Sequence, residues 1–202
     1  MRIAVINEVS ARDKNGQIMA ALKSHGLEAI SIGMGENKAE PELTYIHTGF
    51  MAGLALYTKA ADFVVGGCGT GQGFLLSAMQ YPGVFCGLIE SPLDAWLFSQ
   101  INGGNCASLA LNKGFGWAGD INLHYIFDKL FCDPAGQGYP PHRCESQKGS
   151  REALANISRI AHVDMPAIIK CMDPAIVDIV MNHRPFANFI KQFGRNNICQ
   201  PQ

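Results

Sequence analysis

Five short apolar runs recur along the chain up to residue 111, and each is followed by a segment with helical spacing of its apolar residues. A parallel strand that helices cover on both faces has such a continuous apolar run, because neither face meets water. The runs are RIAVIN (2–7), LEAISIG (27–33), DFVVGG (62–67), VFCGLI (84–89) and CASLAL (106–111). This pattern predicts the α/β class, with a doubly wound, five-stranded parallel sheet in a Rossmann-like αβα sandwich.

Helical spacing and helix stop residues fill the segments between these runs. The predicted helices lie at 13–26, 42–59, 74–80, 92–102 and 121–131. The stretch DPAGQGYPPHRCESQKGS is interrupted by proline and glycine, which predicts a linker. We therefore expect an α/β domain over 1–132, a linker over 133–150 and a C-terminal helical extension over 151–202. That extension is too short for a core of its own, so it should pack on the sheet domain or on a second subunit.

The composition argues against several classes of protein. The formal net charge is −1, so no basic surface for nucleic acid is expected. No apolar run reaches the ~18 residues of a membrane span, and Met1-Arg2 leads directly into an apolar run rather than into a signal peptide. The seven cysteines form no C-x-x-C pair, which fits a reduced cytoplasmic protein better than a disulfide scaffold or a zinc site. We expect no metal and no cofactor.

The stretch FVVGGCGTGQG at 63–73 ends one predicted strand and leads into a helix. Ligands bind at that end of the strands in an open parallel sheet. Glycines let backbone N–H groups point at an anion, and a helix N-terminus favours negative charge. The spacing matches neither the dinucleotide pattern G-x-G-x-x-G nor the P-loop, because Gln72 and Phe74 stand at required positions. The sequence therefore predicts an anion cradle formed by Gly67, Gly69, Gly71 and Gly73.

Cys68 and Thr70 supply the reactive side chains of this loop. A thiol near a helix N-terminus is more often a thiolate, which can act as a nucleophile or as a general base. Thr70 offers a hydroxyl to a nearby oxygen. The alternative is that Cys68 is a small buried apolar residue at a strand end, which is what we expect of most of the other cysteines.

The segment GGCGTGQGFLLSAMQYPGVFCGLIESPLDAWLFSQINGGN at 66–105 resembles the core of the ribose-5-phosphate isomerase B family, which includes the galactose-6-phosphate isomerase subunits. That family has C-G-T-G-x-G in the loop, and QYPG stands at its proline–glycine turn. Upstream, IAVINE stands where the family has an S-D-H-A-G stretch. The resemblance covers roughly residues 2–131, and the cysteine loop is its most specific part.

The resemblance implies a flavodoxin-like αβα sandwich. It also implies interconversion of an aldose phosphate and its ketose phosphate, in a homodimer or homotetramer whose sites are shared between subunits. Cys68 would be the base that moves the proton between neighbouring carbons. Thr70 and the backbone of Gly69 to Gly73 would hold the oxygens of the enediolate. The further substrate-binding residues would be Glu8, Tyr45, His47, Asn102, Arg143 and Arg151.

The chain departs from the family's pattern at the residues that open the sugar ring and bind phosphate. Val9 and Ile101 stand where the family has histidines, and the second of these opens the ring. The family's two phosphate-binding arginines lie four residues apart, whereas Arg143 and Arg151 have no arginine at that spacing. An open-chain substrate, such as a four-carbon sugar phosphate, therefore suits the sequence.

Two other functions compete with this one. A relative without isomerase activity would keep the fold and bind a sugar or a phosphate. A hydrolase or transferase with a cysteine nucleophile would need a base beside the thiol, and only His47 is placed to be considered.

Overall fold

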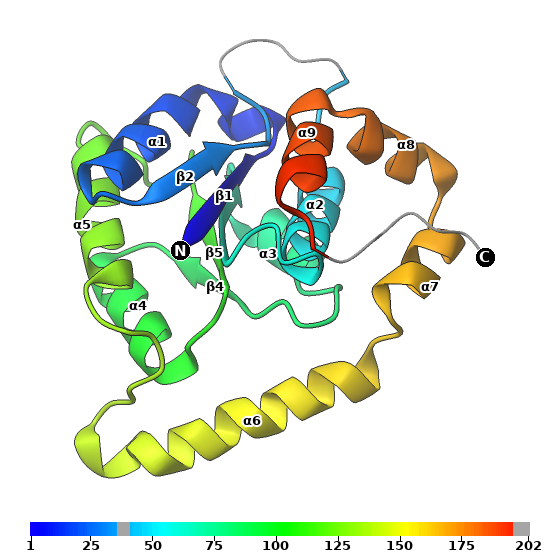
Figure 1. Ribbon diagram of the computed structural model, residues 1–202. Coiled ribbons are helices and arrows are strands. Elements are labelled where there is room, and N and C mark those ends of the chain that lie inside the picture. The colour runs from blue at the N-terminus through cyan, green and yellow to red at the C-terminus, as the bar shows by residue number, and fades with distance from the viewer. Residues whose placement is uncertain (36–40, 196–202) are drawn as a thin grey trace.

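A five-stranded parallel sheet forms the centre of the computed structural model, which describes residues 1–35 and 41–195 (Figure 1). The strands are β1 (Arg2–Asn7), β2 (Glu28–Ser31), β3 (Phe63–Cys68), β4 (Cys86–Ile89) and β5 (Cys106–Ala110). Their order is β2-β1-β3-β5-β4, and each neighbouring pair is parallel. The predicted doubly wound α/β sheet is confirmed, although its ends shift by a few residues.

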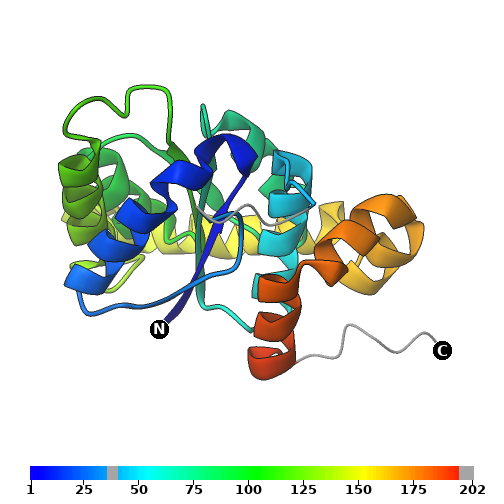
Figure 2. The same ribbon diagram turned by 90° about the horizontal axis from the view of Figure 1, so that it is seen from above.

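Helices cover both faces of the sheet, as Figures 1 and 2 show. One layer holds α1 (Asn15–Ser24), α4 (Pro92–Leu97) and α5 (Gly119–Phe131), and the other holds α2 (Tyr45–Tyr57) and α3 (Gln72–Ala78). Successive side chains of a strand point to opposite faces. Ile3 and Val5 of β1 therefore join the buried cluster of the first layer, whereas Ala4 and Ile6 join that of the second.

The C-terminal helices α7 (Met165–Cys171), α8 (Pro174–Asn182) and α9 (Arg184–Phe193) pack against the second layer. Met165, Val180 and Phe186 are fully buried in one cluster with Phe50 of α2. Of the two partners expected for the extension, the sheet domain is the one that these three helices contact. The end of the expected extension, residues 196–202, lies outside the described residues.

Helix α6 (Cys144–Ala161) begins within the segment that the sequence predicts as a linker. The prolines and glycines of that segment are concentrated before residue 142, in an irregular stretch that ends in the 3₁₀ turn η3 (Pro141–Arg143). Gly149 is tolerated inside α6, where glycine costs ~1 kcal/mol relative to alanine. Figure 1 shows α6 set apart from the sheet along the lower side of the molecule.

Two predicted helices are divided in the structure. A 3₁₀ turn, η1 (Val9–Lys14), precedes α1, and a π-helical turn, η2 (Phe98–Asn102), continues α4. Such turns are local changes of hydrogen-bond pattern that residue spacing alone does not reveal. In the part of the chain that the structure describes, no helix is both long enough and apolar enough to cross a membrane.

Candidate active site

The carboxyl ends of β1 and β3 form the point at which the chain reverses its direction across the sheet. After β1 it moves outward to β2, and β3 pairs on the other side of β1. Ligands bind in the crevice beyond such a point. Glu8 follows β1 and Cys68 ends β3, and the Glu8 N–H donates to the Gly67 carbonyl at 3.2 Å. In Figure 2 the carboxyl ends of the strands lie at the top, beside the start of α3.

The loop after β3 carries Cys68, which is 7% exposed. The Cys68 Sγ and the Thr70 Oγ1 lie 4.0 Å apart. Gly71 has a φ of +74° and precedes α3 as its N-cap residue. A Cβ atom at Gly73 would lie 2.9 Å from the ring of Tyr45, so this aromatic ring rests on the loop. The structure thus brings three of the predicted site elements, Glu8, Tyr45 and the cysteine loop, together beyond the carboxyl ends of the strands.

Three backbone N–H groups of the loop are already occupied. The Gly69 N–H donates to Ser10 Oγ at 3.1 Å, the Gly71 N–H to the Cys68 carbonyl at 3.3 Å, and the Gln72 N–H to Thr70 Oγ1 at 3.3 Å. Among the described residues, neither the Thr70 N–H nor the Gly73 N–H has a partner. The loop can therefore offer an anion two free N–H groups and the Thr70 hydroxyl, a smaller set than the sequence predicts.

Two residues that sequence reasoning missed contact this loop. Ser10 also binds the buried carboxylate of Glu8 through its own N–H, at 3.1 Å, and through its hydroxyl. The Asn112 side chain donates to the Ser10 carbonyl at 2.8 Å, and the Asn112 N–H donates to the Gly69 carbonyl at 2.9 Å. No sequence motif around Ser10 or Asn112 indicates a functional role, because hydrogen bonds to the main chain of distant residues require no particular motif.

His47 lies at the start of α2 and takes part in the N-terminal cap of that helix. Its Nδ1 accepts the Thr44 N–H at 3.0 Å, which requires an unprotonated Nδ1. Burial lowers the pKa of His47 and favours that neutral form. In the described chain no hydrogen bond joins His47 to Cys68, so the hydrolase alternative lacks its positioned base.

Asn102 lies near the amino ends of the strands, whereas Cys68 lies at their carboxyl ends. It ends η2 shortly before Asn105, whose carbonyl accepts the Val64 N–H at 3.0 Å near the start of β3. The four residue steps from Val64 to Cys68 span about 13 Å at the rise of a parallel strand. Within one chain, Asn102 therefore does not join the cysteine loop.

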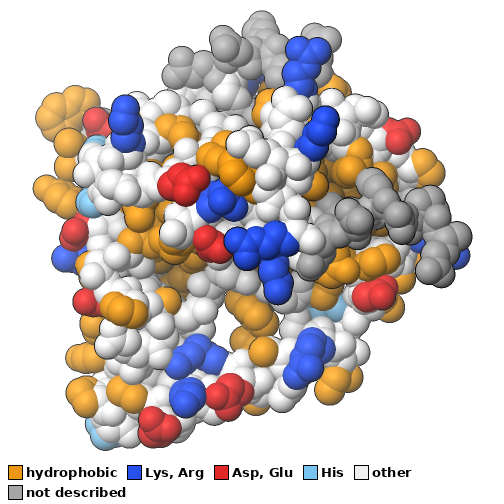
Figure 3. Space-filling view, in the orientation of Figure 1, with side chains coloured by type: hydrophobic (Ala, Val, Ile, Leu, Met, Phe, Trp, Pro, Cys, Tyr) orange, Lys and Arg blue, Asp and Glu red, His pale blue; other side chains and the backbone are white. Residues whose placement is uncertain are grey.

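The predicted arginines also lie away from the cysteine loop. The Arg151 guanidinium donates to the carbonyls of Ile101 at 2.9 Å and Gly136 at 2.6 Å. Arg143 precedes α6, and its Nε donates to Ser146 Oγ at 3.1 Å. Arg151 and Asn102 line a hollow of about 290 Å³ beside α6. Figure 3 shows basic, acidic and apolar side chains interspersed along the lower side of the molecule, where α6 runs.

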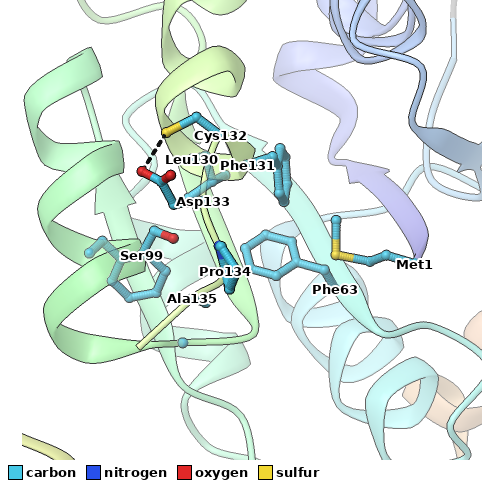
Figure 4. Close-up of a pocket in the computed structure, with 11 residues that line it drawn as sticks. Met1, Phe63, Ser99, Leu130, Phe131, Cys132, Asp133, Pro134 and Ala135 are labelled. Atoms are coloured by element: carbon cyan, nitrogen blue, oxygen red, sulfur yellow. Dashed lines mark hydrogen bonds between the residues drawn. The ribbon is translucent and has the colours of Figure 1, made fainter. Parts of the chain in front are cut away.

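A separate pocket of about 340 Å³ lies at the amino ends of the strands, and Figure 4 shows its lining. Met1, Phe63 and Phe131 make it largely apolar. Partial burial and a hydrogen bond to the Asp133 carboxylate, at 3.3 Å, raise the pKa of the Cys132 thiol. That thiol therefore stays protonated, and the pocket offers no counterpart to the Cys68 loop.

Comparison with known proteins places this geometry in a family. The family model described as Ribose/Galactose Isomerase matches residues 3–120. A ribose-5-phosphate isomerase structure from Vibrio parahaemolyticus is 40% identical and has a TM-score of 0.91, covering 96% of this chain and 93% of that chain. A 4-deoxy-L-threo-5-hexosulose-uronate ketol-isomerase complexed with a tartrate is 37% identical and has a TM-score of 0.93, covering 98% of this chain and 95% of that chain.

More distant structures share the fold over a shorter length. A ribose 5-phosphate isomerase from Thermotoga maritima is 22% identical and has a TM-score of 0.58, and it covers 73% of this chain and 97% of that chain. No curated protein matches the chain.

We expect Gly71→Ala to lower the free energy of unfolding clearly more than Gly83→Ala. The two glycines have φ values of +74° and +73°, where a side chain costs ~1–2 kcal/mol. A Cβ at residue 71 would also lie 2.5 Å from Leu88 Cδ1 and 3.1 Å from the carbonyl carbon of Leu109, whereas residue 83 has open space. Urea unfolding of both variants measures the difference. Equal losses would mean that the loop moves freely to accept the methyl group.

Proposed function

Because the chain belongs to the ribose/galactose isomerase family and is an aldose–ketose isomerase, we propose that it works through a cis-enediolate with Cys68 as the base. One observation carries this proposal. The Cys68 thiol lies 4.0 Å from the Thr70 hydroxyl and shares its loop with two free backbone N–H groups, at the crevice where an open parallel sheet binds its ligand.

The isomerisation moves one carbon-bound proton and one oxygen-bound proton. The Cys68 thiolate takes the proton from the carbon next to the carbonyl, and negative charge develops on the carbonyl oxygen. The Thr70 hydroxyl and the N–H groups of Thr70 and Gly73 stabilise that charge. The hydroxyl proton then moves to the former carbonyl oxygen, and the thiol returns its proton to the neighbouring carbon. No atom enters or leaves the sugar.

Glu8 and Tyr45 are the proposed contacts to the sugar hydroxyls. Both lie beyond the carboxyl ends of the strands, together with the cysteine loop. Tyr45 is 46% exposed, so it is accessible to a ligand. His47 keeps Nε2 for the same use while Nδ1 stays in the helix cap.

The charged end of the substrate is a phosphate in our first proposal, in line with the sugar phosphates of the family. Val9 and Ile101 stand in place of histidines, and an aliphatic side chain cannot donate a proton to a ring oxygen. An open-chain sugar phosphate with four carbons therefore fits better than a cyclic pentose phosphate.

The salt bridges beyond the carboxyl ends of the strands favour a second candidate, a sugar acid. Arg12 lies 3.9 Å from the carboxylate of Glu42, Lys14 pairs with Asp13, and Lys113 lies 2.7 Å from Glu90. A carboxylate carries one charge and needs fewer cationic donors than a phosphate dianion. The resemblance to the uronate ketol-isomerase extends over the C-terminal helices. The resemblance to the Vibrio ribose-5-phosphate isomerase does so too, so the extent of the resemblance favours neither substrate.

We also propose that a second copy of the chain completes the active site. Asn102 and Arg151 share a hollow that lies far from the Cys68 of their own chain. Beside that hollow, α6 exposes the apolar side chains of Leu154, Ile157 and Ile160 to 50%, 57% and 85%. A partner packed on this face would cover those side chains and would bring the Asn102 of one copy to the Cys68 of the other.

Replacing Cys68 by alanine should lower kcat at least about 100-fold, since general base catalysis contributes ~10²–10⁴-fold. The fold should survive, because a buried cysteine is a small apolar residue. Conversion of each sugar is followed by NMR of aldose and ketose. Cys171→Ala, at an exposed cysteine, is the matched control and should keep full activity. A Cys68→Ala enzyme with near-normal kcat would assign the base to another residue, with Glu8 the first to test.

Open-chain substrates should be converted with a kcat/KM about 100-fold above that of D-ribose 5-phosphate, because the missing ring-opening acid is worth ~10²–10⁴-fold. The panel is D-erythrose 4-phosphate, D-ribose 5-phosphate and 4-deoxy-L-threo-5-hexosulose uronate. A preference for the uronate supports the sugar-acid candidate, and a preference for erythrose phosphate supports the first proposal. Ile101→His should improve only the cyclic sugar. An unmodified enzyme that prefers D-ribose 5-phosphate would show that another residue opens the ring.

A shared site predicts complementation between two inactive variants. Cys68→Ala and Asn102→Ala should each be inactive alone, and co-refolding them in equal amounts should restore about a quarter of the activity, because half of the C2 dimers then hold one intact site. Co-refolding each variant with itself is the control. An active Asn102→Ala enzyme would remove Asn102 from the site, and inactive mixtures would place both residues in the site of one chain.

A further inference from the structure

We propose that Ser10 and Asn112 are positioning residues that hold the two peptides around Gly69 so that the Thr70 N–H faces the substrate; the catalytic part of this inference rests on the proposed function. Ser10 follows β1, Gly69 follows β3 and Asn112 follows β5. These strands are neighbours in the sheet, so their ends meet at one place. We call this arrangement the Ser10–Gly69–Asn112 clamp.

The first peptide, between Cys68 and Gly69, is held at both of its polar groups. Its carbonyl accepts the Leu111 N–H at 3.0 Å and the Gly71 N–H at 3.3 Å. Its N–H donates to Ser10 Oγ at 3.1 Å. This peptide cannot rotate without losing those hydrogen bonds, and Ser10 withdraws the Gly69 N–H from the set that could bind an anion.

The second peptide, between Gly69 and Thr70, is held only at its carbonyl. That oxygen accepts the Asn112 N–H at 2.9 Å and the Lys113 N–H at 2.8 Å. In a trans peptide the carbonyl and the N–H point in opposite directions. Binding of the carbonyl to the chain after β5 therefore turns the Thr70 N–H to the other side, where it has no partner in the described chain.

Glu8 sets the direction of the Ser10 hydroxyl. Glu8 is 6% exposed, and its carboxylate accepts both the N–H and the hydroxyl of Ser10. A serine hydroxyl has one hydrogen and two lone pairs, so donation to Glu8 leaves a lone pair for the Gly69 N–H. The Asn112 side chain joins the two sides by donating to the Ser10 carbonyl at 2.8 Å.

The clamp leaves little space at Gly69. A Cβ atom there would lie 3.2 Å from Asn112 Nδ2 and 3.3 Å from Ser10 Oγ. Glycine at this position is therefore explained by the two side chains that close on it, in addition to any approach of a ligand. Small displacements of a catalytic group can lower a rate about 100-fold, so a loosened clamp should affect catalysis before it affects folding.

The first test is an exchange measurement that needs no substrate. In the unmodified protein the Gly69 amide should exchange slowly with deuterium, and the Thr70 amide should exchange fast. Ser10→Ala should speed exchange at Gly69 about fivefold, the change expected when a net hydrogen bond of ~1 kcal/mol is removed, and Ser10→Thr should restore protection because it keeps the hydroxyl. Fast exchange at Gly69 in the unmodified protein would overturn the clamp, whatever reaction the protein catalyses.

The second test separates positioning from a merely structural role. With whichever sugar of the panel is converted, Ser10→Ala should lower kcat about 10- to 100-fold and change KM less than threefold, and Ser10→Thr should recover most of kcat. Asn112→Ala removes only the side-chain link to Ser10 and should have a smaller effect in the same direction. Ser24→Ala, a serine of α1 away from this edge, is the matched control. A parallel loss of kcat and of stability in Ser10→Ala, without rescue by Ser10→Thr, would overturn the positioning role. An unmodified protein that converts no sugar of the panel would contradict the proposed function. The exchange measurement at Gly69 would then still test the clamp.

Discussion

The pairing of β3 with β1 on one side and with β5 on the other determines where Glu8, the cysteine loop and Asn112 lie. Parallel pairing sets the three carboxyl ends side by side, so the residues that follow them can bind one another through short contacts. The Glu8 N–H reaches Gly67, and Asn112 and Lys113 reach Gly69. A shift of one residue in either pairing would move the cysteine loop and turn its side chains to the other face of the sheet.

This pairing also limits what the loop can bind. A glycine-rich loop suggests many free N–H groups, yet hydrogen bonds within the loop and to Ser10 occupy those of Gly69, Gly71 and Gln72. The N–H groups of Thr70 and Gly73 remain, together with the Thr70 hydroxyl. Two or three directed donors suit the oxygens of an enediolate, whose charge is spread over neighbouring atoms.

The same sheet separates the proposed site residues into two groups. Glu8, Tyr45 and the cysteine loop lie beyond the carboxyl ends of the strands, whereas Asn102 and Arg151 lie near the amino ends. Helix α6 is held to the body through Arg151 and through the hydrogen bond from the Gly83 N–H to Ser158 Oγ, at 3.1 Å, and it leaves apolar side chains exposed. A dimer would cover the exposed apolar side chains of α6 and would bring the two groups of site residues together.

The α/β class, the five strands and the cysteine loop could be predicted from local sequence patterns. Continuous apolar runs such as RIAVIN and DFVVGG, each followed by a segment with helical spacing, indicate buried parallel strands, and the spacing of Cys68, Thr70 and the glycines is a local property. Tertiary structure sets the strand order β2-β1-β3-β5-β4, the start of α6 at Cys144, the capping role of His47 and the separation of Asn102 from Cys68. It also decided which N–H groups stay free, because Ser10 and Asn112 approach Gly69 only when three strands distant in sequence pair in one sheet. A hydrogen bond between residues 10 and 69 depends on that pairing, and no local pattern of residues encodes it.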